Sequence, residues 1–404
     1  KEAVTYPSAA LEQALGRTLG VPVFQEQVMQ VSILAAGFTP GEADGLRRAM
    51  AAWKRKGGLE KYYNRIVDGM TARGYQKEFA VQIFEQIKGF SEYGFPESHA
   101  ASFALLVYAS CWLKHTEPAA FLAAMLNSQP LGFYSPSQLV QDAKRHGVEV
   151  RAVDVMFSAL DATLEDLPHT PAVRLGLGLI AGLKRASAER IVAARAQEPF
   201  ESAEDLSRRA NLEQHEMKLL AAADALASLS GHRRQQVWDA AALHAPPLLL
   251  RDAPVEEELL ELPEAPEGEE IVFDYAALGL TLRRHPMALL RQRLSAMRFK
   301  SSQALRELPN GRLVRACGIV TLRQQPGTAK GVVFVSLEDE HGSVQVIVWK
   351  SVREQQRQAL MNAKLLGVYG TWQREGEVRN LIAQRLVDLT HLLGQLSAPS
   401  RDFH

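Results

Sequence analysis

The hydrophobic and polar positions of residues 8–130 follow the pattern of helices joined by short, well-marked turns, and strand signals are sparse there. Residues 174–230 change to a short apolar stretch, a glycine turn and two Ala/Leu-rich helices. Residues 312–390 change again, to β-branched residues in alternating runs. The pattern therefore predicts a multidomain protein that is mainly α-helical first and all-β afterwards.

Capping signals predict where several helices begin. Thr39-Pro40-Gly41-Glu42 has the residues of a capping box and predicts a helix through Met50. Three further helices are expected to begin just after the hydroxyl side chains of Ser98, Thr116 and Ser135. Each such hydroxyl can accept a hydrogen bond from the first turn, so these positions set the helix starts.

The alternating runs after residue 312 match a small barrel. Five runs, interrupted once by a helical segment over residues 351–361, have the number and order of strands of an OB-fold. The predicted strands are Leu313–Thr321, Val332–Leu337, Val344–Trp349, Leu365–Trp372 and Arg379–Leu386.

The charges are segregated along the chain, although 46 basic and 46 acidic side chains cancel to a net charge of zero. Residues 276–404 carry 19 Lys and Arg against 9 Asp and Glu, whereas residues 246–275 carry 1 against 10. The acidic stretch also contains several prolines and is predicted to be an exposed linker. The basic last module is the part expected to meet a polyanion.

Composition excludes several classes of protein. The hydrophobic fraction of 47% is enough for ordinary cores, and 2 cysteines are too few for a disulfide scaffold. No apolar run approaches the roughly 20 residues that span a bilayer. The first residues contain neither an initiator Met nor a signal-peptide core. We therefore expect a cytoplasmic protein that is a piece of a longer chain.

A cluster of cations in the helical part has the chemistry of a triphosphate site. Arg47 and Arg48 lie late on the predicted helix, and Lys54 and Lys56 lie just beyond its end, so several cations can converge on one polyanion. The alternative is a solvated basic helix end that complements the helix dipole.

A second cluster precedes the next helix. Ser98 and His99 are placed where a loop meets a helix N-terminus, so that backbone N–H groups, a hydroxyl and an imidazole can face phosphate oxygens. The alternative is a capped turn with aromatic packing, and the residues alone leave both readings open.

Residues 176–183, followed by Lys184 and Arg185, have the layout of a helix-hairpin-helix element. Gly178 and Gly182 belong to a glycine turn that lets the backbone approach a DNA phosphate, and the next helix offers free N–H donors. An ordinary αα-hairpin is the alternative. A second copy over residues 212–229 lacks the glycine turn and is expected to be structural.

Two loops of the predicted barrel are expected to flank a bound single strand. Trp349 is a candidate stacking platform, with burial in the core as the alternative. The basic residues at these loops are Arg323, Lys330, Arg374 and Arg379.

Motifs for catalysis are missing from the sequence. It contains no Asp-x-Asp on a strand, no phosphate-binding G-x-x-x-x-G-K-[ST] and no H-E-x-x-H. We therefore predict no catalytic residue and no metal ligand in this chain.

Four ordered motifs resemble the bacterial C-family DNA polymerases, which are relatives of the DNA polymerase III alpha subunit. They are Val23–Met29, Ala43–Met50, Tyr93–Ala101, and Leu278-Gly279-Leu280 with Arg284-His285-Pro286. The resemblance covers about residues 6–390, and residues 95–103, 323–331 and 374–377 are most similar to the error-prone, damage-inducible branch.

The resemblance implies the C-terminal part of an error-prone polymerase that acts in damage-induced translesion synthesis. It implies that the arginines of the cation cluster approach the incoming dNTP, that the two lysines fall in a lysine-rich stretch, and that Ser98 and His99 belong to the loop that closes on the nucleotide. The Mg²⁺ ligands are palm carboxylates of the family that lie outside this chain, so the chain is expected to be inactive alone.

The resemblance also implies a domain order and a set of partners. The expected parts are a fingers domain (1–160), a tandem helix-hairpin-helix region (161–245), the acidic linker (246–275), a helical connector (276–310), the OB-fold domain (311–392) and a tail (393–404). The implied partners are primer-template and single-stranded DNA, dNTPs, an inactive Y-family-like polymerase, a RecA-like accessory protein, and the sliding clamp, although no clear clamp motif is visible.

Other functions are compatible with parts of the sequence. The barrel pattern also resembles the anticodon-binding domains of class II aminoacyl-tRNA synthetases, which would suit a non-catalytic nucleic-acid-binding protein. A scaffold that binds proteins through the acidic linker needs no nucleic acid, and the replicative alpha-subunit paralogue is a further alternative.

Overall fold

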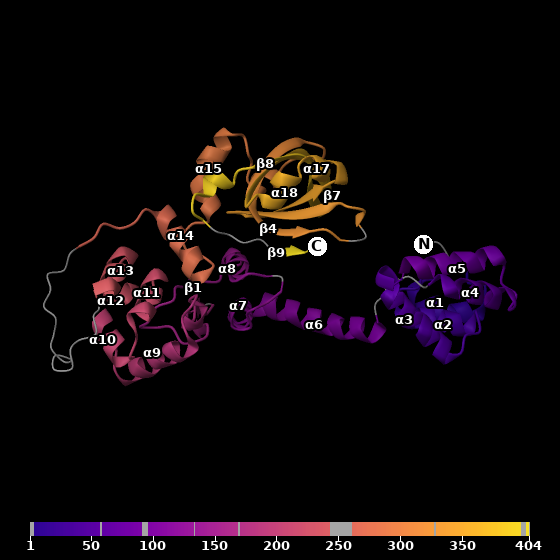
Figure 1. Ribbon diagram of the computed structural model, residues 1–404, viewed down its shortest axis with the longest axis horizontal. Helices are drawn as coiled ribbons and strands as arrows, with labels where there is room; N and C mark the ends of the chain where they lie inside the picture. The colour runs from indigo at the N-terminus through magenta and orange to yellow at the C-terminus, as the bar shows by residue number, and fades with distance from the viewer. Residues whose placement is uncertain are drawn as a thin grey trace. The chain divides into compact units, whose positions relative to one another are not determined.

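The computed structural model describes residues 4–56, 59–90, 96–132, 134–168, 170–242, 261–326, 329–396 and 401–403. The chain forms two compact units, Lys1–Leu113 and Lys114–His404 (Figure 1). The predicted order of a helical first part and a β-barrel at the end is confirmed.

Unit 1 is a bundle of helices around one hydrophobic core. Leu46, Leu59, Ile66, Met70 and Ile87 are among its fully buried side chains. The helices are α1 (Ala9–Leu15), α2 (Gln25–Leu34), α3 (Pro40–Lys56), α4 (Tyr63–Thr71), α5 (Lys77–Phe90) and α6 (Glu97–Thr116), the last of which runs past the end of the unit.

The capping box of α3 is confirmed. The backbone N–H of Thr39 donates to Glu42 Oε2 at 2.7 Å, and the backbone N–H of Glu42 donates to Thr39 Oγ1 at 3.2 Å. Arg65 Nε also donates to Glu42 Oε1 at 3.2 Å. These hydrogen bonds lower the pKa of Glu42 to about 2, and the bond from Arg65 has the largest effect. The helix continues to Lys56, beyond the end predicted at Met50.

The predicted caps of the next helices are right in one case. Ser135 caps α8 (Pro136–Arg145), because its Oγ accepts a hydrogen bond from the N–H of Gln138. Ser98 and Thr116 do not act as caps, since both lie inside α6. The helix that follows, α7 (Pro118–Asn127), begins with proline and has no side-chain cap bond.

The helical part of unit 2 has one core that joins α7 and α8 to the helix-hairpin-helix region. Leu122 of α7, Val140 of α8 and Ile191 of α9 belong to the same buried cluster. The further elements are the strands β1 (Val150–Arg151), β2 (Thr163–Glu165) and β3 (Ala172–Arg174), in the sheet order β1-β3-β2, and the helices α9 (Arg185–Gln197), α10 (Ala203–Arg209), α11 (Gln214–Ala222), α12 (Ala227–Ser230) and α13 (Arg233–Ala242).

Two predicted boundaries are therefore corrected. A domain over residues 1–160 does not match the packing, because α7 and α8 bury their apolar faces in unit 2 rather than in unit 1. The exposed linker predicted over residues 246–275 is wrong in its last part, where α14 (Glu267–Leu278) buries Ile271 and Asp274. Residues 246–260 of the predicted linker lie outside the described residues.

A connector of α14, α15 (Pro286–Ala296) and α16 (Ser302–Arg306) leads to the barrel. Its side chains form a small core with the outer face of the barrel, in which Met287, Leu294 and Phe299 meet Cys317 and Leu365. This packing fixes the connector on one side of the barrel and leaves other faces of the barrel to solvent.

The barrel has the five strands of an OB-fold. The order is β5-β6-β8-β7-β4, β4 also pairs with β5 and so closes the sheet, and β6 and β8 run parallel. The elements are β4 (Leu313–Gln324), β5 (Val333–Asp339), β6 (Gly342–Val348), α17 (Lys350–Gln355), α18 (Arg357–Asn362), β7 (Leu365–Glu375) and β8 (Val378–Asp388), with β9 (Arg401–Phe403) beside β4. All five predicted strands are found, and the predicted helix between the third and fourth strands is broken at Gln356.

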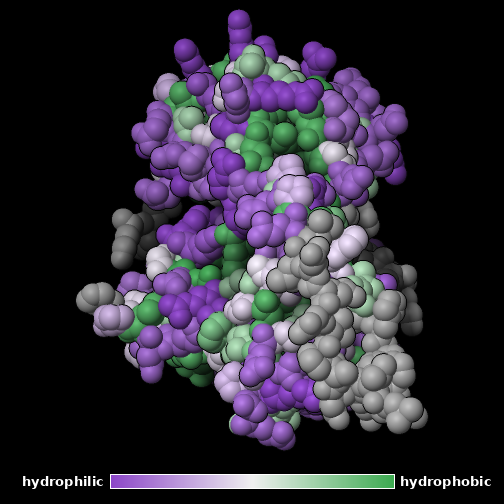
Figure 2. Space-filling view, turned by 90° about the vertical axis from the view of Figure 1, so that its left-hand side faces the viewer, coloured by the Kyte–Doolittle hydropathy of each residue, from purple (hydrophilic) through white to green (hydrophobic). Residues whose placement is uncertain are grey.

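Hydrophilic residues cover much of the face of the protein seen in Figure 2, with smaller hydrophobic patches between them. Within the described ranges, no helix combines the length and the hydrophobicity that a membrane crossing requires.

Candidate nucleic-acid interface

Many arginines of the barrel and its entry form no ion pair within the described part of the chain. In the helical part of unit 2, exposed arginines are held by carboxylates, as in the pairs Arg185–Glu189 at 2.9 Å and Arg208–Asp205 at 3.1 Å. Among the described residues of the barrel and its entry, none of the following arginines forms an ion pair: Arg298, Arg306, Arg312, Arg315, Arg353, Arg357, Arg374, Arg379 and Arg385. This surface therefore carries positive charge that the protein itself does not neutralise.

Three carboxylates of the barrel, those of Glu338, Asp339 and Glu340, lie at the β5–β6 turn and face the connector. Arg291 of α15 pairs with Glu340 at 2.5 Å and with Asp339 at 3.4 Å. His285 Nε2 lies 3.3 Å from Glu338 Oε1. These three acids are therefore paired with side chains of the connector and not with the arginines named above.

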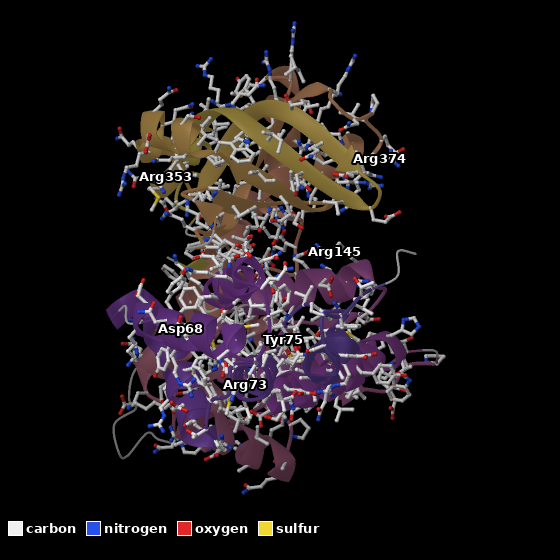
Figure 3. The ribbon with its side chains drawn as sticks, turned by 90° about the vertical axis from the view of Figure 1, so that its right-hand side faces the viewer. Asp68, Arg73, Tyr75, Arg145, Arg353 and Arg374 are labelled. Carbon is white, nitrogen blue, oxygen red and sulfur yellow. The ribbon has the colours of Figure 1, made fainter. Side chains whose placement is uncertain are left out.

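The predicted barrel residues Lys330, Trp349 and Arg374 are exposed, and Arg379 is half-buried. Trp349 lies just before α17 and is 52% exposed. Its ring is therefore available for stacking. Arg353 of α17, which the sequence reasoning missed, donates from Nη1 to the carbonyl oxygen of Gly331 at 3.2 Å, at the end of the β4–β5 loop. Figure 3 shows Arg353 and Arg374 at well-separated places on the barrel.

Arg323 was predicted to contact nucleic acid, and the structure corrects this. The residue lies within β4 and is only 4% exposed. Its guanidinium donates to the carbonyl oxygens of Leu360, at 2.7 Å, and of Ala363. These carbonyls belong to the C-terminal end of α18, so Arg323 fastens that helix to the barrel and is not available to a ligand.

The helix-hairpin-helix turn presents only part of the predicted surface. Gly182 has φ +82°, a conformation that favours glycine, and it precedes the N-terminus of α9. No described acceptor binds the backbone N–H groups of Gly182, Lys184 or Arg185. By contrast, the N–H of Gly178 donates to the carbonyl oxygen of Leu160 at 2.8 Å, so the predicted phosphate contact of Gly178 is corrected to a structural bond.

The second hairpin has a different turn. Asp224 takes the left-handed conformation at φ +61° and pairs with Arg283 at 2.8 Å. This turn is thus fastened to the segment after α14 and offers no cation to a phosphate.

In unit 1, one carboxylate holds the two predicted arginines together. Asp44 Oδ1 accepts hydrogen bonds from Arg47 at 2.8 Å and 3.0 Å, and Asp44 Oδ2 accepts one from Arg48 Nε at 2.9 Å. These hydrogen bonds lower the pKa of Asp44, and the bond from Arg48 has the largest effect. The side chains of Arg47 and Arg48 are 40% and 73% exposed, so both can still meet a ligand.

The other predicted residues of unit 1 lie on the last turn of α3 and the first turn of α6. Lys54 and Lys56 lie on the last turn of α3, and their side chains fall outside the described part. Ser98 and His99 lie in the first turn of α6, where the N–H of Glu97 donates to Glu26 Oε2 at 2.9 Å. Within the described residues, no hydrogen bond, ion pair or ring contact joins these two to the arginines of α3.

Several large hydrophobic side chains of α6 are exposed to solvent. Leu105 is 74% exposed, Tyr108 is 75% exposed and Trp112 is 55% exposed. Helices that are hydrophobic all round are normally buried against other protein.

Three protein-family models match separate parts of the chain. The bacterial DNA polymerase III alpha subunit finger domain matches residues 1–74, the helix-hairpin-helix motif matches residues 147–236, and the OB-fold nucleic acid binding domain matches residues 297–389. The three matches follow the order of parts predicted from the sequence.

Curated relatives match the chain from end to end. An error-prone DNA polymerase of Burkholderia pseudomallei is 59% identical over 408 residues, which are 99% of this chain and 38% of the relative. One of Bordetella parapertussis is 57% identical over 412 residues, which are 100% of this chain and 39% of the relative. One of Azoarcus sp. is 57% identical over 402 residues, which are 98% of this chain and 38% of the relative. The chain thus spans less than two fifths of the length of these relatives.

Proposed function

We propose, from the homology of this chain along its whole length to bacterial error-prone DNA polymerases, that it supplies the nucleotide-side and DNA-binding parts of such a polymerase. The activity is template-directed DNA synthesis across damage, within DNA repair and the response to DNA damage. In this proposal the OB-fold barrel binds single-stranded template, the first hairpin binds a DNA phosphate, and α3 binds the phosphates of the incoming dNTP.

The observation that carries the DNA-binding part of the proposal is the set of barrel arginines without acidic partners. Arginines that neutralise the phosphates of DNA release the counterions condensed on the DNA, and this release favours binding. Trp349, exposed beside these charges, provides a ring on which a base can stack. Lys330 and Arg374 add cations at the two loops that flank an OB-fold ligand.

The first hairpin suits a single phosphate contact. The free N–H groups of Gly182, Lys184 and Arg185 lie at the start of α9, where the helix dipole favours an anion. The Lys184 and Arg185 side chains add charge, although Arg185 also pairs with Glu189.

Arg47 and Arg48 suit the binding of a triphosphate because Asp44 already holds both guanidiniums on one side of α3. Each guanidinium has further N–H donors that Asp44 does not occupy. Charge-assisted bonds from two arginines can then orient the phosphates without ordering flexible side chains at the moment of binding. Lys54 and Lys56 on the same helix, and Ser98 and His99 at the start of α6, complete the proposed nucleotide side.

Chemistry would require the rest of a longer polypeptide. The described residues contain no group of three or more His, Cys, Asp or Glu side chains placed to hold a metal ion. In the proposal, Mg²⁺ is held by carboxylates of the additional length that the relatives have. The exposed apolar residues of α6 suit packing against further protein of that kind.

The proposed setting is the cytoplasm, where the chain meets primer-template DNA and dNTPs. An inactive Y-family-like polymerase, a RecA-like accessory protein and the sliding clamp are the proposed companions. Pull-down of each purified protein by this chain checks them one at a time, and a companion that is not retained is removed from the proposal.

DNA binding is tested with the whole 404-residue chain and a fluorescent single-stranded oligonucleotide. We expect the logarithm of the affinity to fall linearly as the logarithm of the salt concentration rises. Trp349→Ala should weaken binding about 5-fold to 100-fold, as expected for the loss of one stacked base worth about 1–3 kcal/mol. Trp238→Ala, at an exposed tryptophan outside the barrel, is the matched control and should leave the affinity unchanged. Absence of binding at low salt would overturn the proposal.

Nucleotide binding is tested by placing Arg47→Ala with Arg48→Ala in a polymerase-length protein that contains this chain. We expect kcat/KM for the dNTP to fall while primer-template affinity is kept. Unchanged dNTP kinetics would remove the nucleotide role and favour the alternative of a DNA-binding chain that does not contact the nucleotide.

A further inference from the structure

Three residues form a row across the outer face of the barrel. In the strand register Arg315 of β4 is opposite Tyr369 of β7, and Tyr369 is opposite Arg385 of β8. The two guanidiniums lie over the same tyrosine ring, with Cζ atoms 4.8 Å and 5.5 Å from the ring centroid. Because β4 and β8 flank β7 on opposite sides, the ring joins two cations that would otherwise repel each other.

A β-bulge brings Arg385 into this row. The register of β7 and β8 shifts between Tyr369 and Gly370, so that Gln384 is an extra residue on β8. The side chain of Gln356, at the break between α17 and α18, holds the bulge: its Nε2 donates to Gln384 O at 3.2 Å, and its Oε1 accepts from the N–H of Leu386 at 2.7 Å.

Gly370 makes the close approach of the two strands possible. A Cβ atom at this position would lie 2.1 Å from the carbonyl oxygen of Ile382, a distance that no side chain tolerates. Bulges change the direction of side chains, and this one turns an exposed arginine toward Tyr369.

The two arginines of this row form no ion pair with an acidic side chain among the described residues. Within the described part of the chain, neither Arg315 nor Arg385 pairs with a carboxylate, and Arg315 bonds only the carbonyl oxygen of Met297, at 3.2 Å. The backbone N–H of Lys300, an exposed residue, donates to Arg315 O at 2.8 Å. Phe299 supports the arrangement from below, with its ring 5.6 Å from that of Tyr369.

We propose that Arg315 and Arg385, held by Tyr369, form a second phosphodiester-binding site on the outer face of β4, β7 and β8. This inference rests on the proposed function, in which the barrel binds DNA. Each guanidinium can bind a phosphate through two parallel N–H donors while its face stays on the ring. The ring is covered by the cations, so the site reads the backbone of the nucleic acid and not its bases.

The site is separate from the loops that flank the proposed single-strand groove. Along the β7–β8 ladder, the pair Tyr369–Arg385 lies five residues of β7 away from the pair Arg374–Arg379, or about 17 Å at about 3.4 Å per residue. DNA long enough to pass the loops can therefore contact both places.

The experiment compares two oligonucleotides bound by the 404-residue chain, one of about 6 nucleotides and one of about 30, because OB-folds cover about 4–16 nucleotides. Arg315→Ala with Arg385→Ala should leave the affinity for the short DNA unchanged. For the long DNA it should reduce the slope of log affinity against log salt by about 1.4, since each phosphate contact with single strands contributes about 0.7. Arg385→Ala alone, at an exposed position, should reduce this slope by about 0.7.

Matched variants separate the causes. Lys77→Ala with Lys218→Ala removes the same number of charges from exposed positions outside the barrel and should leave both slopes unchanged. Tyr369→Leu keeps both charges but removes the ring, so it should weaken long-DNA binding by less than the double arginine variant. Equal urea midpoints of the variants and the original chain verify that folding is kept.

The outcomes distinguish this inference from the proposed function. If the original chain binds neither oligonucleotide, both fail. If it binds both, and Arg374→Ala with Arg379→Ala weakens binding while Arg315→Ala with Arg385→Ala changes nothing, the second site alone is wrong. If the arginine row is needed for binding of a poly-glutamate peptide and not for DNA, the site belongs to an acidic protein segment and the inference is overturned.

Discussion

Arg374 and Arg379 are directly opposite each other in the β7–β8 ladder, at the hairpin that joins these strands. Like charges in this arrangement destabilise a sheet. The Nε atom of Arg379 is also buried without a hydrogen-bond partner. Among the described residues, neither arginine pairs with a carboxylate. A phosphate bound between them would supply the missing anion, which is the arrangement expected where binding takes precedence over stability.

Replacing Arg374 with Gln is therefore expected to affect stability and binding in opposite directions. The free energy of unfolding should stay equal or rise by about 0.2–1 kcal/mol, because the repulsion across the ladder is relieved. The affinity for single-stranded DNA should fall, together with the salt slope. Urea unfolding and fluorescence anisotropy measure the two effects, with Lys218→Gln, at an exposed position outside the barrel, as the control for loss of charge. A variant that loses stability as well as affinity would contradict this account.

Arg233 is predicted to be essential for the stability of unit 2. It is 3% exposed and pairs with Asp274 and with Glu270, whose Oε2 lies 3.0 Å from Arg233 Nη1. Arg233→Ala would leave these buried carboxylates short of a partner, at a cost of about 3 kcal/mol in the free energy of unfolding.

The neighbouring arginine is the control for this prediction. Arg234 pairs with Glu269 at 2.9 Å on the surface, where both side chains are more than a third exposed. Arg234→Ala should therefore change the free energy of unfolding by about 0.5 kcal/mol or less. Similar urea midpoints for the two variants would show that the buried network is not decisive.

The start of α3 is expected to loosen in acid. The pKa of Glu42 is lowered from 4.5 to about 2, chiefly by Arg65 and then by Thr39, so its ionised form stabilises the folded state. A carboxyl group with a lowered pKa stabilises the folded state at pH values above the unfolded pKa of 4.5. This contribution to stability is lost as the pH falls from 4.5 toward 2.

Hydrogen exchange of the first-turn amides of α3 measures this effect. Glu42→Gln should exchange faster than the original chain near neutral pH, and the difference should shrink as the pH falls through this window. Glu85→Gln, which removes a single exposed ion pair with Lys88 at 3.8 Å, is the matched control. A difference that does not depend on pH would exclude the carboxylate as its source.

The two cysteines should differ in reactivity. Cys111 is exposed on α6, whereas Cys317 is buried in the barrel and burial raises its pKa to about 12. Because the thiolate is the reacting form, a thiol reagent should modify one cysteine rapidly in the native chain and the second only after unfolding. Cys111→Ser should abolish the rapid phase and Cys317→Ser should keep it. Two rapid phases in the native chain would mean that the barrel core opens readily.

Features that depend on neighbouring residues could be predicted from the sequence. The capping box at Thr39 and the cap at Ser135 were right because a cap and its partner lie three residues apart. The five strands of the barrel followed from alternation along each strand. The ordered motifs, together with these elements, were enough to predict a resemblance to the C-family DNA polymerases.

Other features were fixed only by residues distant in the sequence. The basic, loop-bordering position of Arg323 suggested a DNA contact, yet its guanidinium bonds carbonyl groups 37 and 40 residues later in the chain. The acidic composition of residues 267–275 suggested a linker, yet Arg233 and Arg283 neutralise Asp274 and allow α14 to pack.

The sequence by itself thus determined most of the elements and their order, because helix caps and strand alternation are local patterns. Only the tertiary structure decided which charges are neutralised within the protein and which remain for a ligand. Arg315 and Arg385, 70 positions apart, become neighbours of Tyr369 only through the strand register and the bulge at Gly370. Charge pairing depends on distance in space, and no count of charges along the chain contains that distance.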